Sequence, residues 1–408
     1  MTATEPRQTP LLLPERARLF HIGLPKTGTT HLQNAAALLR DDLLAHGVHY
    51  PGRTFNHRRE VSSFMGRGWG WGDKPTREHW DRLMAEVEAD TENRIWLGHE
   101  FASESSEEKA YDFREALGDR THVVVTLRHY GSILASSWQQ YMKMGDTVGF
   151  ERWLEAVLAD PPNRKVTKTF HTRNDQGLVV SRWAEVVGPE NVTAIVIDKA
   201  TPNLLTDAFE DLLGLPRGLL TTAEQDGYSS NRGMSVEEAE LLRAVNAEFR
   251  RRELPWPAYE HWMRRGVAGH VMASRKPGEG DTSFELPAWA AEKATARAHA
   301  YVDRIEATGV RVVGDLDALR VPARSVENPV LTADRVPLDA AAEAVVGAIE
   351  AGLLKDEDLA AAKAQIAELR EAARTPGHDV LGHFRATELA AEVGRRAARR
   401  ARGLLRRS

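Results

Sequence analysis

The sequence of 408 residues contains no cysteine, which excludes disulfide bonds and catalysis by a thiol. It has no apolar stretch of about 18 residues, the length that a membrane-spanning helix needs. The three leucines at residues 11–13 form too short a run for the core of a secretion signal. The formal net charge is only −5, so no overall positive charge indicates a nucleic-acid partner. Together these absences predict a cytoplasmic enzyme or binding protein.

The composition is that of a folded globular protein. Hydrophobic residues make up 42% and charged residues 28% of the chain, which are ordinary values for this class. Strand-like and helix-like segments alternate over about 200 residues, a pattern typical of parallel sheets with helices on both faces. We therefore predict an α/β fold with a central parallel sheet flanked by helices.

A glycine-rich loop near the N-terminus is the most informative stretch. Residues 19–22 have the composition of a buried strand, and residues 23–30 (Gly-Leu-Pro-Lys-Thr-Gly-Thr-Thr) separate them from an amphipathic helical pattern. In such a loop the glycines allow backbone N–H groups to face an anion, and the helix N-terminus adds a partial positive charge. The sequence therefore predicts a phosphate-binding loop in a P-loop-like sheet.

This loop differs from the loop of P-loop kinases, whose pattern is Gly-x4-Gly-Lys-Ser/Thr. Gly23 and Gly28 have the required separation, but Thr29 occupies the position of the lysine. A lysine lies instead in the middle of the loop, at Lys26. From there its ammonium group would reach a different part of a ligand.

Polar residues also follow two later predicted strands. Residues 95–98 end at His99 and Glu100, and a β-branched run ends at Arg128. Ligands bind at the carboxyl ends of the strands in open parallel sheets. His99 and Glu100 are therefore candidate general bases, and the planar guanidinium of Arg128 suits a phosphate group.

Residues 53–75 are rich in glycine, tryptophan, histidine and arginine. Long irregular stretches of this kind are commonly substrate or lid loops, although a plain surface loop is the alternative. We predict a substrate loop in which Trp69 and Trp71 are available to stack on a ring. His57, in the same stretch, is a third candidate base.

Residues 25–30 resemble the 5′-phosphosulfate loop of sulfotransferases that use 3′-phosphoadenylyl sulfate (PAPS) as donor. In that family the loop lysine contacts the bridging oxygen of the phosphosulfate, and the Thr-Thr pair holds the 5′-phosphate. The resemblance assigns these roles to Lys26, Thr29 and Thr30. His31 stands where cytosolic members often have a tryptophan that stacks on adenine. The donor-binding loop would consist of Pro25, Lys26, Thr27, Gly28, Thr29 and Thr30.

The resemblance extends to the candidate bases. Residues 94–99 are similar to the Arg-Ile-x-x-x-His pattern that carries the catalytic histidine of cytosolic sulfotransferases, with Leu97 in place of the family's lysine. Carbohydrate sulfotransferases use a glutamate base, so Glu100 competes with His99. The choice among His99, Glu100 and His57 stays open.

Two further segments match the family in spacing. Arg128 and Ser136 correspond to the pair that grips the donor's 3′-phosphate, with Tyr130 in place of the family's proline. Arg275 and Lys276 resemble the late basic loop that closes over the same phosphate. A solvated basic turn explains this last segment equally well.

We expect three parts: a loose segment at residues 1–18, a sulfotransferase domain at residues 19–325 and a helical extension at residues 326–408. The extension becomes rich in arginine after residue 395. A basic helix of this kind can lie peripherally on an anionic membrane or contact an acidic partner. The alternative is a solvated helix end.

The resemblance implies transfer of a sulfonate group from PAPS to a hydroxyl or amine of a small-molecule or carbohydrate acceptor, with release of 3′-phosphoadenosine 5′-phosphate (PAP). This scheme requires no metal. A Mg-ATP-dependent small-molecule kinase is one alternative, but it leaves the shifted lysine and the Arg128/Ser136 pair without roles. A degenerate nucleotide-binding scaffold with a docking tail is the other. The sequence leaves the acceptor and the oligomeric state open.

Overall fold

A computed structural model describes residues 11–68, 72, 74–167, 169–198, 200–223 and 232–372. Its centre is a six-stranded sheet with the strand order β2-β3-β1-β4-β5-β7, in which neighbouring strands are parallel. The predicted α/β class with a central parallel sheet is confirmed. The strands are β1 (Arg18–His21), β2 (Val48–His49), β3 (Arg94–Leu97), β4 (Thr121–Arg128), β5 (Val192–Ile197) and β7 (Arg311–Val313).

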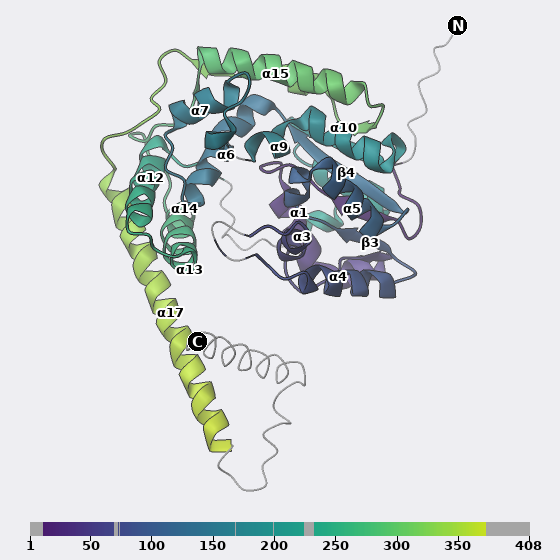
Figure 1. The fold of residues 1–408 in the computed structure, drawn as a ribbon, viewed down its shortest axis with the longest axis horizontal. Helices are drawn as coiled ribbons and strands as arrows, with labels where there is room; N and C mark the ends of the chain where they lie inside the picture. The colour runs from purple at the N-terminus through teal and green to yellow at the C-terminus, as the bar shows by residue number, and fades with distance from the viewer. Residues whose placement is uncertain are drawn as a thin grey trace, which may run out of the picture. The chain divides into compact units, whose positions relative to one another are not determined.

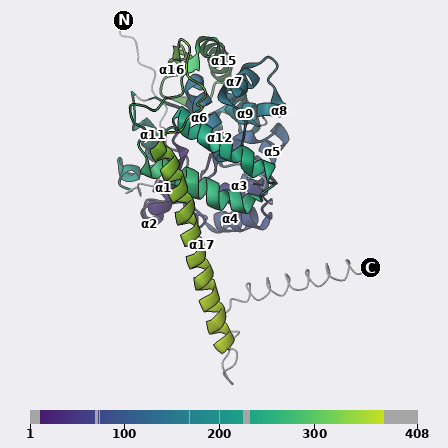
Figure 2. The ribbon, with the colours of Figure 1, turned by 90° about the vertical axis from the view of Figure 1, so that its left-hand side faces the viewer.

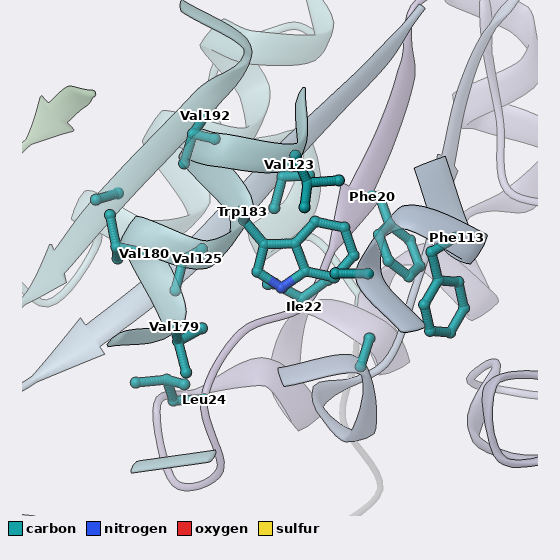
Figure 3. Close-up of a cluster of buried hydrophobic side chains, with 14 of the residues drawn as sticks. Phe20, Ile22, Leu24, Phe113, Val123, Val125, Val179, Val180, Trp183 and Val192 are labelled. Carbon is teal, nitrogen blue, oxygen red and sulfur yellow. The ribbon is translucent and has the colours of Figure 1, made fainter. Parts of the chain in front are cut away.

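One face of the sheet is buried against five helices. Phe20 of β1 and Val123 and Val125 of β4 lie on this face with Phe113 and Trp183 (Figure 3). The ring centroid of Phe20 is 5.1 Å from that of Phe113 and 5.7 Å from that of Trp183. Full burial of one such side chain contributes about 1.5–3 kcal/mol. The helices are α3 (Arg58–Phe64), α4 (Glu78–Ala89), α5 (Glu107–Leu117), α10 (Gln176–Val187) and α15 (Ala288–Glu306).

The opposite face is buried as well. Leu19 and Val124 pack there with Trp96 and with Phe209. Successive residues of a strand point to opposite faces, so burial on both faces explains the continuous apolar runs of β1 and β4. The covering helices are α1 (Thr29–Leu38), α2 (Arg40–Ala45) and α11 (Leu204–Leu213).

A second, helical layer has its own core, built around Trp138, Trp153, Phe170 and Tyr259. Its α6, α7, α12 and α14 lie to the left of β3, β4 and α4 in Figure 1, and α12 runs beside α6 in Figure 2. The layer comprises α6 (Tyr130–Lys143), α7 (Phe150–Leu158), α8 (Arg164–Thr167), α9 (Phe170–Asn174), α12 (Val236–Arg251), α13 (Trp256–Ala258), the π-helix η4 (Tyr259–Ala268) and α14 (Gly269–Ser274), with the paired strands β6 (Leu286–Pro287) and β8 (Ser325–Val326).

The chain divides into two compact units, Met1–Gly347 and Ala348–Ser408. Within the predicted extension lies α17 (Leu338–Ala372), which follows α16 (Asp317–Arg320). The arginine-rich end lies outside the described residues, and no helix within them is long and apolar enough to cross a membrane. The boundaries predicted at residues 18 and 325 stay predictions. Leu13, however, is buried and its N–H donates to Leu212 O, so this part of the expected loose segment is packed.

The prediction of an irregular loop at residues 53–75 is wrong in part, because α3 occupies Arg58–Phe64. This short helix forms because the Phe64 ring stacks on that of Phe113 at 4.1 Å and is buried. Trp69 and Trp71 lie outside the described residues.

The order of the strands determines where a ligand can bind. β1 lies between β3 and β4, and the chain leaves β1 toward β2 and β3 before it crosses to β4. Ligands in open parallel sheets bind in the crevice beyond the carboxyl ends of the strands at such a reversal. The loop after β1, the 3-10 helix η1 (Glu100–Glu104) after β3 and the start of α6 after β4 meet at this edge.

Gly98, between β3 and η1, is required by close approach of the backbone. Its φ is +131°, and a Cβ there would lie 2.2 Å from the carbonyl oxygen of His21. We expect Gly98→Ala to lower the free energy of unfolding by at least about 3 kcal/mol, through strain and overpacking. Chemical denaturation measures this loss. Gly280→Ala, with open space around the new methyl group, is the control, and equal stability of the two variants would contradict the assignment.

Candidate functional site

The loop after β1 forms an anion cradle at the start of α1. Gly28 precedes the helix with φ +79°, no side chain caps it, and its first turn contains no acidic residue. The first N–H groups of the helix and its positive dipole end are therefore available to an anion. The Thr27 hydroxyl fixes the loop, because it lies 2.5 Å from both Leu24 O and the Thr126 hydroxyl.

Lys26 is held in an unusual backbone conformation at the centre of this loop. Its φ is +69°, in the left-handed region that residues other than glycine rarely adopt. Its carbonyl oxygen accepts a hydrogen bond of 2.8 Å from Arg128 Nη1. Burial lowers the pKa of the Lys26 ammonium, and the charge of Arg128 lowers it further. Backbone strain of this kind is commonly found at functional sites.

Arg128 ends β4 and is fixed by α10. Its N–H donates to Gln176 Oε1 at 3.2 Å, and Gln176 Nε2 donates to its carbonyl oxygen at 2.6 Å. Among the described residues, neither Lys26 nor Arg128 has an ion pair with a carboxylate, although burial lowers the pKa of both. Two partly buried cations without anionic partners favour an anionic ligand.

His99 and Glu100 lie together beyond β3. His99 is 3% exposed and its Nδ1 accepts a hydrogen bond from the backbone N–H of Phe101 at 3.2 Å. Burial lowers the pKa of His99, so the ring is neutral near pH 7 and carries its proton on Nε2. That nitrogen lies 3.3 Å from Glu100 Oε2. The imidazole and the carboxylate are therefore in contact, and the carboxylate is the group with capacity to accept a proton.

One cavity of about 1490 Å³ collects most of the predicted site residues. The anion cradle, the two candidate bases after β3, and the Arg128/Ser136 pair all line this cavity. Ser136 lines it from α6, where its hydroxyl donates to Ile133 O at 3.0 Å. Thr27 is buried beneath the loop, outside the lining. The lining includes Pro25, Lys26, Gly28, Thr29, Thr30, His99, Glu100, Arg128 and Ser136.

The structure assigns His57 a structural role and not that of a base. Its side chain is 1% exposed and lies outside the cavity lining. Nδ1 accepts from the N–H of Gly98 at 3.3 Å, and Nε2 donates to Pro51 O at 2.8 Å. Burial lowers the pKa of His57 to about 4. With both ring nitrogens engaged by the backbone, the ring connects the segment after β2 to the end of β3.

Arg275 and Lys276 do not line the cavity, in contrast to the role that the resemblance implies. Arg275 is buried in a cluster of carboxylates: Nη1 donates to Glu238 and Asp281 at 2.9 and 2.8 Å, and Nε donates to Asp339 at 2.8 Å. Lys276 is exposed. The Arg275 guanidinium therefore neutralises buried acids instead of a phosphate.

Sequence reasoning missed several cations of the cavity. Arg58, Arg232 and Arg264 line it from three separate segments. Lys143, at the end of α6, lies within electrostatic reach of Lys26, and burial together with that charge lowers its pKa to about 7. No sequence motif marks these residues, since only the fold brings them together.

Comparisons with known proteins give little further information. No model of a protein family matches the sequence, and no curated protein matches it. Among solved structures, the chain is similar to a sulfotransferase from Alicyclobacillus acidocaldarius, with a TM-score of 0.43 and 16% identity, over 75% of this chain and 99% of that one. Similarity this distant does not indicate an activity, so the function is inferred from the residues of the site.

The contacts of Arg275 generate a stability test. Arg275→Met removes the cationic partner of the Asp281 carboxylate and one of the two arginines that pair with Glu238, and we expect a loss of about 3–5 kcal/mol in the free energy of unfolding. Lys276→Met, next to it but exposed, is expected to change stability by less than about 0.5 kcal/mol. Chemical denaturation compares the two. Arg275→Met with unchanged stability and weakened PAP binding would instead restore the phosphate-binding role.

Proposed function

We propose that this protein is a PAPS-dependent sulfotransferase that acts on a hydroxyl or amine of a small-molecule or carbohydrate acceptor. The observation that carries the proposal is the convergence of Lys26 and Arg128, both without carboxylate partners among the described residues, beside the carboxylate of Glu100. Such a site can bind a multiply charged phosphate ester and accept a proton next to it.

The residues present fit the donor. The uncapped N-terminus of α1, with Thr29 and Thr30, offers N–H donors to the 5′-phosphate. Arg128, at the end of β4, and Ser136, on α6, are the proposed ligands of the 3′-phosphate. The mixed anhydride of the donor supplies an activated sulfonate, and Lys26 stabilises the negative charge that grows on the departing phosphate oxygen.

Glu100 is the proposed base. It accepts the proton of the acceptor hydroxyl as the new S–O bond forms and the bond from sulfur to the phosphate oxygen breaks. His99, whose Nδ1 already accepts from Phe101, is proposed to position the Glu100 carboxylate through the 3.3 Å contact of its Nε2 with Oε2. This division of roles selects Glu100 from the three candidates, and His99 becomes a positioning residue.

The donor-binding residues make PAP affinity the first test. We expect PAP to bind in the presence of EDTA, and Arg128→Ala to weaken binding about ten- to a hundredfold, since a charge-assisted contact contributes about 1.5–3 kcal/mol. Lys26→Ala is expected to have a smaller effect, because PAP lacks the sulfonate. Isothermal titration calorimetry measures all three.

Arg120→Ala is the matched control, because Arg120 is exposed just before the opposite end of β4. It should leave PAP affinity unchanged. Binding of Mg-ATP but not of PAP by the wild-type protein would refute the proposal and favour the kinase.

The assignment of the base generates a second test. Glu100→Gln retains the size of the side chain but cannot accept the proton, so we expect kcat to fall by about 10²–10⁴ while PAP affinity is unchanged. The assay is PAP formation from PAPS with an accepted hydroxyl compound. Full activity of Glu100→Gln, combined with its loss in His99→Gln, would transfer the role of base to His99.

A further inference from the structure

The cavity is larger than one nucleotide requires. Ligand sites are typically about 300–1,000 Å³, whereas this cavity measures about 1490 Å³. The proposed donor residues follow β1 and β4. The remaining lining includes two arginines, Arg58 and Arg264, that no step of the proposed reaction uses.

These two arginines come from different layers of the molecule. Arg58 is the first residue of α3, which packs on the sheet, and Arg264 lies on the π-helix η4 of the helical layer. Figure 1 shows α3 next to the sheet and α13 and α14, which flank η4, in the other layer. π-Helices are rare and occur frequently at functional sites. The two arginines therefore line one cavity from separate layers, close enough for the charge of Arg58 to act on Arg264.

The charges around this pair favour an anion. Burial lowers the pKa of Arg264, and the like charge of Arg58 lowers it further. The charge of Glu260 opposes this shift in both Arg58 and Arg264. Glu260 also lies 3.8 Å from Arg264 and 3.3 Å from Arg265, so three guanidinium groups share this one carboxylate. Two arginines that repel each other in a partly buried wall are stabilised when an anion lies between them.

Glu100 lies within electrostatic reach of both Lys26 and Arg58. Burial lowers the pKa of Lys26 and of Arg58, and the negative charge of Glu100 opposes the shift in both. An acceptor whose hydroxyl meets Glu100 would thus lie within electrostatic reach of both Lys26 and Arg58. A negatively charged substituent of the acceptor would meet the arginines.

We infer that Arg58 and Arg264 form a subsite for an anionic group of the acceptor, a carboxylate or a sulfate or phosphate ester, so that the acceptor is an anionic hydroxyl compound. This inference rests on the proposed function, because only a sulfotransferase would use the bound anionic molecule as an acceptor. The anion subsite itself is defined by the two arginines alone.

The experiment uses two pairs of probes that differ only in charge: methyl β-D-glucuronide with methyl β-D-glucoside, and 4-hydroxybenzoate with 4-hydroxybenzamide. Calorimetry measures their binding to the full chain with and without saturating PAP. We expect the anionic member of at least one pair to bind about tenfold or more tightly than its neutral partner. Arg58→Gln or Arg264→Gln should remove this preference and leave PAP affinity unchanged.

The chain offers a matched control for each variant. Arg59→Gln and Arg265→Gln make the same change in charge at adjacent exposed positions outside the cavity lining, and both should keep the preference. Absence of any preference, or a preference that survives Arg58→Gln and Arg264→Gln but is lost in Arg128→Ala, would overturn the inference. Failure of PAP to bind would refute the proposed function separately, since the probes are also titrated without PAP.

Discussion

One hydrogen bond, from the Arg128 guanidinium to the carbonyl oxygen of Lys26 at 2.8 Å, joins the two strand ends on which the site depends. It fixes Lys26 in a left-handed backbone conformation and holds Arg128 against the loop. Both cations are thereby confined to one edge of the sheet, where bulk water cannot fully solvate them. An anionic ligand would remove that cost, which is the physical reason for proposing the cradle as the ligand site.

Buried neutral histidines provide the second constraint. His57 connects the segment after β2 to Gly98, and Nε2 of His99 lies 3.3 Å from Glu100 Oε2. In both rings burial lowers the pKa, so the imidazoles act as fixed donors and acceptors near neutral pH. In the proposed mechanism, the Glu100 carboxylate next to His99 can then accept a proton without competition from the imidazole rings. The two histidines thus belong to the scaffold, and the Glu100 carboxylate next to His99 is the proposed reactive group.

Much of this arrangement could be predicted from the sequence. Apolar runs identified β1, β3 and β4, and the carboxyl ends of parallel strands necessarily lie at one edge, which placed Lys26, Glu100 and Arg128 together. Contacts between distant segments could not be predicted. Arg275 has the same sequence context whether it faces a phosphate or carboxylates, and its partner Asp339 is 64 residues away. The cavity arginines, on α3 and η4, likewise meet only through the fold.

The most direct test of the account is a crystal structure of the protein with PAP. The account predicts the 5′-phosphate on the N–H groups at the start of α1 next to Lys26, and the 3′-phosphate on Arg128 and Ser136. It also predicts that the Glu100 carboxylate faces the open end of the 5′-phosphate. A nucleotide bound in the reverse orientation, or held by Arg275 and Lys276 away from the cradle, would contradict it.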